Sequence, residues 1–140
     1  MKQILPIAAA LAIFGAGAVA VHAQGTGQTV SDSSAVFDAM HPDSNGTVAD
    51  KITHAPAGDV LALYIGRMPK QMYSKQDDLL YVVSGFGSAS VGYPSFDIKP
   101  GSVVSIPRNT AFEIRARGNQ PIKAILIASP VDNPDDKKVL

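Results

Sequence analysis

Three polar side chains that could do chemistry stand close together between residues 71 and 78. They are Gln71, Tyr73 and Asp78. A tyrosine hydroxyl and a carboxyl group can act as general acid and general base when burial raises the pKa of the carboxyl group. Because Asp77 precedes Asp78, the same carboxylates also fit a solvated turn before a strand. The spacing leaves both interpretations open.

Composition excludes several other kinds of chemistry. The chain has no cysteine, so thiol catalysis, iron–sulfur clusters and zinc–thiolate sites are ruled out. It contains no nucleophile motif and no glycine-rich phosphate loop, and the glycines of residues 85–88 mark a hairpin turn because no helix follows. The charge balance of 12 basic and 12 acidic residues argues against nucleic acid and against docking to anionic lipid.

Two histidines lie in the body of the chain. His41 precedes a turn-rich segment, and His54 ends an apolar run. Either imidazole could approach Asp78. The simpler interpretation is that both lie on the surface or at the rim of the domain.

Short strands are predicted to position these side chains. Eight apolar or alternating runs follow one another closely, and several are rich in the Val, Ile, Tyr and Phe that favour a pleated surface. They are Val48–His54, Val60–Ile65, Leu79–Val83, Ser88–Val91, Phe96–Lys99, Val103–Ile106, Ala111–Ala116 and Pro121–Ala128. A short helical turn is expected only at Ser34–Met40, so the pattern predicts an all-β sandwich or barrel.

Two segments resemble the paired motifs of the cupin family. They are residues 71–85, QMYSKQDDLLYVVSG, and residues 100–112, PGSVVSIPRNTAF. In the family, the first motif has His-x-His, then Glu and a strand that ends in Gly; the second has Pro-Gly, Pro-x-Gly and His. Asp78 stands where the family has Glu. Asn109 stands where Gly is usual, and this exchange is compatible with the motif because Asn and Gly both tolerate a left-handed turn. The resemblance implies a single small jelly-roll β-barrel over residues 48–130.

The histidines with which cupins hold a metal are replaced in both motifs. Gln71 and Tyr73 occupy the two positions of the first motif, and Phe112 occupies that of the second. Phenylalanine has no donor atom, and a glutamine amide and a neutral phenol are weak ligands compared with imidazole. The one carboxylate, Asp78, cannot offset the cost of stripping water from a divalent cation. We therefore predict no metal site and no other cofactor.

The altered interior is expected to bind a small molecule. Because side chains alternate along a strand, an inward Asp78 implies an inward Leu80, and an inward Phe112 implies an inward Ile114. An apolar interior with a few polar groups is the usual form of a ligand pocket. We predict that Gln71, Tyr73, Asp78 and Phe112 contact an organic or carbohydrate ligand, and we assign no catalytic residue.

Two other functions stay open. The resemblance to cupins allows a metal-independent isomerase or lyase that uses Tyr73 and Asp78. It also allows a structural barrel with a filled interior, in which Gln71 and Tyr73 bond to each other, and which forms a homodimer through its sheets.

Residues 1–23 have the pattern of a cleaved export signal. Lys2 precedes the apolar run Ile4–Val21, and Val21-His22-Ala23 places small residues where a signal peptidase cuts. An uncleaved membrane anchor is the alternative, because the run is just long enough to span a bilayer. Cleavage predicts a periplasmic or secreted chain that begins near Gln24 and has no further membrane span.

The mature chain of 117 residues is expected to form one domain. Residues 24–47 are predicted to be a linker and a short N-terminal segment. Residues 48–130 are predicted to form the barrel. Residues 131–140, which carry five charged side chains, are predicted to be a polar, loosely ordered tail.

Overall fold

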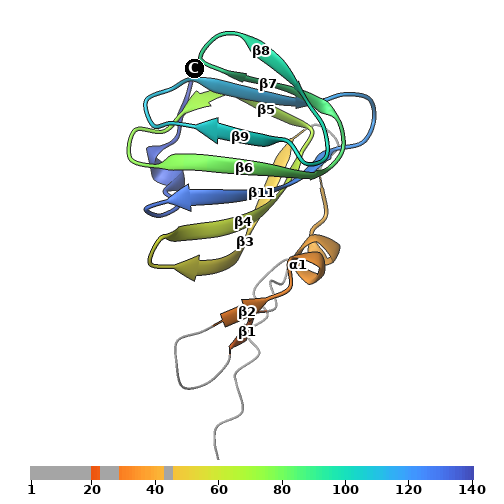
Figure 1. Cartoon of the computed structure of the whole chain (residues 1–140), viewed down its shortest axis with the longest axis vertical. Coiled ribbons are helices and arrows are strands. Elements are labelled where there is room, and N and C mark those ends of the chain that lie inside the picture. Colours follow the sequence, from red (N-terminus) through yellow and green to blue (C-terminus); the bar gives the residue numbers. More distant parts are fainter. Residues whose placement is uncertain (1–19, 23–28, 43–45) are drawn as a thin grey trace, which may run out of the picture.

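Two five-stranded antiparallel sheets pack face to face and form the body of the chain (Figure 1). The structure is a computed structural model that describes residues 20–22, 29–42 and 46–140. In spatial order the first sheet contains β12 (Lys138–Val139), β5 (Arg67–Met72), β10 (Phe112–Ala116), β7 (Gly87–Val91) and β8 (Ser95–Ile98). The second contains β3 (Thr47–Ala55), β4 (Gly58–Ile65), β11 (Ile122–Ser129), β6 (Asp77–Ser84) and β9 (Val103–Ile106). The predicted all-β jelly-roll architecture is confirmed.

All eight predicted strands are present, and their ends agree with the prediction to within about two residues. Among the strands that the sequence did not predict is β5, whose residues RMPKQM lack the β-branched run typical of a strand. It forms because Met68 pairs with Ile114 and Gln71 pairs with Phe112 on β10. Strand β12 pairs with β5 only at Met72 and Gln71, so Pro69 lies on a sheet edge, where proline is tolerated.

The glycine positions of the two motifs are left-handed turns. Gly85 and Gly101 have φ angles of 93° and 91°, and Asn109 has a φ angle of 59°. The left-handed turn expected at Asn109 is therefore present. The backbone N–H of Asn109 donates to the backbone carbonyl of Tyr73 at 2.6 Å. The turn of the second motif thus fixes the backbone of a candidate site residue in the first.

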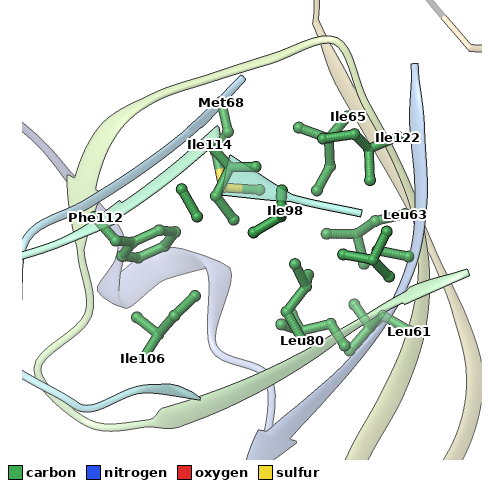
Figure 2. Close-up of a cluster of buried hydrophobic side chains, with 14 of the residues drawn as sticks. Leu61, Leu63, Ile65, Met68, Leu80, Ile98, Ile106, Phe112, Ile114 and Ile122 are labelled. Atoms are coloured by element: carbon green, nitrogen blue, oxygen red, sulfur yellow. The ribbon is translucent and has the colours of Figure 1, made fainter. Parts of the chain in front are cut away.

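Alternation along the strands places the core between the sheets, as predicted. On β6, Asp78, Leu80 and Val82 are buried, whereas Leu79 and Tyr81 are exposed on the outer face. Figure 2 shows Phe112 and Ile114 from the first sheet and Leu80 and Leu61 from the second, all directed into the same interior cluster. The homodimer that the resemblance allows stays a prediction.

A second apolar cluster covers part of the outer face of the second sheet, over β3 and β4. It is formed by helix α1 (Ser33–Ala39), which agrees with the helical turn expected at Ser34–Met40. Asp32 caps the helix by accepting a hydrogen bond from the Ser34 N–H at 2.9 Å. The helix buries Phe37 against Ile52 and its neighbours on the strands below.

The predicted export signal lies outside the described residues except for β1 (Ala20–His22). That strand pairs with β2 (Thr29–Ser31), within the segment predicted to be a linker. None of the helices in the described part of the chain is long and apolar enough to cross a membrane. Export stays a prediction.

Residues 131–140 are not the loosely ordered tail that their composition predicts. They fold back along the barrel as the turn η1 (Pro134–Asp136) and the strand β12. The Asp136 carboxylate accepts hydrogen bonds from the backbone N–H groups of Ser74 and Lys75, both at 2.7 Å. The prediction failed because these partners lie about 60 residues away in sequence, where composition gives no signal. We refer to residues 131–140 below as the C-terminal strap.

Candidate functional site

A cavity of about 560 Å³ lies between the inner faces of the two sheets. Its walls are mainly apolar and include Leu61, Leu80, Ile106, Ile114 and Leu126. Residues of the C-terminal strap line it as well. The cavity argues against the alternative of a barrel with a filled interior.

All four predicted ligand-binding residues line this one cavity. Gln71 and Phe112 are register partners on β5 and β10. The ring of Tyr73 is stacked on that of Phe112, with 6.1 Å between the ring centroids. Asp78 enters from β6 in the opposite sheet. The two motifs, which are far apart in sequence, therefore converge as their spacing predicts.

Several polar groups in the cavity have no protein partner. Gln71 is only 6% exposed, yet within the described part of the chain its amide makes no hydrogen bond, and neither does the Tyr73 hydroxyl. The Gln71–Tyr73 bond expected for a filled barrel is thus not formed. Among the residues described, Ser31 Oγ alone is both sealed from solvent and unpartnered, so the free atoms of Gln71 and Tyr73 reach open space. These polar atoms are therefore free to bond to a ligand or to water in the cavity.

Gln76 is a buried residue of the site that the sequence analysis missed. It is 1% exposed, and its Nε2 donates to Asp78 Oδ1 at 2.8 Å. Its Oε1 accepts from the backbone N–H of Asn133 in the C-terminal strap at 2.7 Å. Gln76 therefore links the strap to the cavity carboxylate. Its i, i+2 spacing from Asp78 was a usable signal, because such residues share a strand face.

The two neighbouring aspartates have opposite environments. Burial raises the pKa of Asp78 to about 6; the hydrogen bond from Gln76 opposes this rise, and the Asp132 and Asp77 carboxylates add to it. Asp77 is exposed and paired with Arg108, which lowers its pKa to about 2. The solvated-turn interpretation therefore holds for Asp77 and the buried interpretation for Asp78.

Tyr73 is a proton donor at all ordinary pH values. Burial first, and then the Asp78, Asp132 and Asp136 carboxylates, raise the pKa of its hydroxyl to about 12. A phenol with this pKa stays protonated, so it can donate a hydrogen bond but cannot act as the base.

The raised pKa of Asp78 predicts that Asp78→Asn stabilises the chain at neutral pH. Because the folded-state pKa of about 6 lies above the ordinary 3.8, ionising Asp78 costs stability as pH rises from about 4 through 6. The asparagine should therefore be more stable by about 1–2 kcal/mol at pH 7.5, after allowance for solvent screening. At pH 3 the two proteins should be equally stable. Urea unfolding at both pH values checks this, and lower stability of the variant at pH 7.5 would contradict the assignment.

The site does not fit the divalent metal that the resembled family holds. It offers Gln71, Tyr73 and Asp78 but no imidazole, and Phe112 has no donor atom. The described residues contain no group of three His, Cys, Asp or Glu side chains that could hold a metal ion.

Neither His41 nor His54 supplies the missing imidazole. The Nδ1 of His54 lies 2.6 Å from Asp59 Oδ1. The imidazole of His54 therefore contacts Asp59 and not Asp78. Asp59 is fully buried and also accepts from Lys51 and from the backbone N–H of Asp132. His41 is exposed.

Comparison with known proteins shows the fold but no close relative. No family model matches the chain. The uncharacterized protein MJ1618 of Methanocaldococcus jannaschii is 23% identical over 111 residues, which cover 78% of this chain and 83% of that protein.

Three solved structures share the architecture. The nucleoside dehydratase Pac13 of Streptomyces has a TM-score of 0.60 and 17% identity, and the match covers 70% of this chain and 81% of Pac13. A double-stranded β-helix protein of Klebsiella pneumoniae has a TM-score of 0.60 and 12% identity, with 71% and 88% covered. The cupin domain of Schizosaccharomyces pombe Cnp3 has a TM-score of 0.54 and 13% identity, with 59% and 63% covered. At these identities the likeness shows the fold alone.

Proposed function

Because the chain has the cupin fold without the imidazoles that hold a metal in that family, we propose that it binds a small organic molecule without a metal. The observation that carries the proposal is the amide of Gln71, a residue only 6% exposed, which has no hydrogen-bond partner among the described residues and lines an apolar cavity together with Tyr73 and Asp78. The volume of about 560 Å³ lies in the usual range for ligand sites. Export to the periplasm or medium is part of the proposal and rests on the pattern of residues 1–23.

A matched pair of variants on one strand tests the proposal. Leu126 lines the cavity, and the next residue, Ile127, is exposed on the outer face. Leu126→Phe should fill part of the cavity, whereas Ile127→Phe adds the same ring to the outside. A set of aromatic and sugar-like fragments is screened by ligand-observed NMR against the wild type and both variants.

We expect fragments that bind the wild type and Ile127→Phe and bind Leu126→Phe at least about 10-fold more weakly, which corresponds to 1.4 kcal/mol. The absence of any fragment that binds the wild type would contradict the proposal. So would fragments that bind Leu126→Phe as well as they bind the wild type. Circular dichroism spectra of the variants check that both are folded.

One observation favours catalysis as a second candidate function. A pKa of about 6 makes Asp78 an efficient base near neutral pH, and the protonated Tyr73 hydroxyl is available as an acid. This pair suits a metal-independent isomerase or lyase, and the fold carries a dehydratase in Streptomyces. Conversion of a bound fragment by the wild type and not by Asp78→Asn, followed by NMR over hours, would establish it. If no bound fragment is converted, the catalytic candidate is rejected and binding remains the proposed function.

A further inference from the structure

Two further carboxylates lie near the cavity carboxylate, Asp78. The Asp132 and Asp77 carboxylates act on Asp78, and the Asp78, Asp132 and Asp136 carboxylates act on Tyr73. In the described part of the chain, no Lys, Arg or His side chain lies within salt-bridge distance of Asp78 or Asp132. An uncompensated carboxylate in an apolar cavity is costly, and a cationic ligand would remove that cost.

Two cations, Arg67 and Lys137, also line the cavity. Arg67 precedes Gln71 by four residues on β5, about 13 Å along the strand. Lys137 belongs to the C-terminal strap, and its side chain is exposed. Within the described part of the chain, neither cation forms a salt bridge with Asp78 or Asp132.

The unpartnered polar groups near Asp78 include three hydrogen-bond acceptors, beside the donors of the Gln71 amide and the Tyr73 hydroxyl. Asp78 has an oxygen that Gln76 does not use, and Gln71 Oε1 and the Tyr73 oxygen have no donors among the described residues. A primary ammonium group has three donors and no acceptor, which matches three acceptors. The neighbouring Tyr73 and Phe112 rings favour a cation over their faces, and the apolar walls suit a hydrocarbon or aromatic body.

We infer that the ligand is an organic primary amine whose ammonium group lies against Asp78, Gln71 and Tyr73 and whose apolar body fills the cavity. This inference rests on the proposed function and specifies the ligand class of the same site. It assigns to Asp78 the selection of ligand charge, and to the two aromatic rings the selection of an organic cation over a hydrated inorganic one.

Three probes that share one ring test the inference. Tyramine carries an ammonium group, tyrosol carries a hydroxyl in its place, and 4-hydroxyphenylacetate carries a carboxylate. Their affinities are measured by titration calorimetry or NMR at pH 7.5. We expect tyramine to bind at least about 10-fold more tightly than tyrosol, with 4-hydroxyphenylacetate weakest. Asp78→Asn should remove the preference for tyramine and leave tyrosol unchanged.

The matched control is Asp97→Asn. Asp97 is an exposed aspartate whose only partner in the described chain is Arg117, and it does not line this cavity. This variant should retain the preference for tyramine. If tyrosol or 4-hydroxyphenylacetate equals tyramine, and Leu126→Phe still abolishes binding, the amine inference is wrong and the proposed function stands. Failure of tyramine to bind the wild type also overturns the inference, while binding of the probes to Leu126→Phe overturns the proposed function itself.

Discussion

Replacing Gln71, Tyr73 and Phe112 together by histidine is expected to create a divalent-metal site in the cavity. Gln71 and Phe112 are register partners, the Tyr73 and Phe112 rings are 6.1 Å apart, and all three side chains share a cavity with Asp78. Three imidazoles and one carboxylate are a donor set that transition metals prefer. Each single variant adds one imidazole, and one imidazole together with Asp78 supplies too few ligands to hold a metal ion.

The expected gain is large. The triple variant should bind zinc at least about 100-fold more tightly than any single variant, or about 3 kcal/mol. Without metal it should be less stable than the wild type by about 2–3 kcal/mol, because histidine fills the Phe112 space poorly and needs polar partners. Saturating zinc should restore about that amount by mass action.

The control for the triple variant is the same protein with Asp78→Asn. It keeps the three imidazoles and loses the carboxylate, so its zinc affinity should fall. Calorimetric titration of zinc into untagged protein measures all the affinities. If the triple variant binds no better than the single variants, these side chains do not converge, and the alignment of the two motifs is wrong.

Gln76→Leu is expected to be the most damaging single change at the site. Leucine leaves Asp78 Oδ1 and the Asn133 N–H buried without partners. The cost should be about 2–3 kcal/mol, since each lost buried partner costs 1–3 kcal/mol and the leucine recovers part. Loss of the amide donor also raises the pKa of Asp78 further, so the destabilisation should be greater at pH 8 than at pH 5.

Gln120→Leu provides the matched control. Gln120 is exposed in the loop before β11, and its replacement should change stability by less than about 0.5 kcal/mol. Thermal unfolding of the three proteins at pH 5 and pH 8 gives the comparison. Equal melting temperatures for the two leucine variants at pH 8 would show that Gln76 does not link the strap to Asp78.

The sequence predicted those parts of the site that depend on local spacing. Alternation along a strand correctly placed Asp78 with Leu80, and Phe112 with Ile114, on inner faces. The spacing of the second motif placed Asn109 in a left-handed turn, and that turn holds the backbone of Tyr73. Strand alternation and turn geometry depend on near neighbours, so a single sequence is enough to predict them.

The parts that depend on distant partners could not be predicted. Strand β5 has a weak strand sequence and forms through pairing with β10, more than 40 residues later. The C-terminal strap looks like a solvated tail, yet Asp136 and Asn133 bond to residues about 60 positions earlier. These contacts place the strap along the cavity, so the shape and lining of the cavity follow only from the three-dimensional structure.

Asp78→Asn is expected to have opposite effects on stability and on function. The substitution should raise stability at neutral pH and remove the preference for tyramine. The carboxylate is predicted to lower stability at neutral pH and to be required for tyramine binding. Residues that serve a ligand commonly cost stability in this way. A barrel selected only for stability would have no need of a buried aspartate whose pKa is raised to about 6.

The most direct test of the central claim is the location of a bound ligand. Intermolecular NOEs are recorded between tyramine, or the tightest fragment, and the labelled protein. We predict contacts to the ring protons of Tyr73 and Phe112 and to the methyl groups of Leu126, which line the cavity. Contacts confined to Leu79, Tyr81 and Ile127 on the outer face of the second sheet would contradict the proposed binding site.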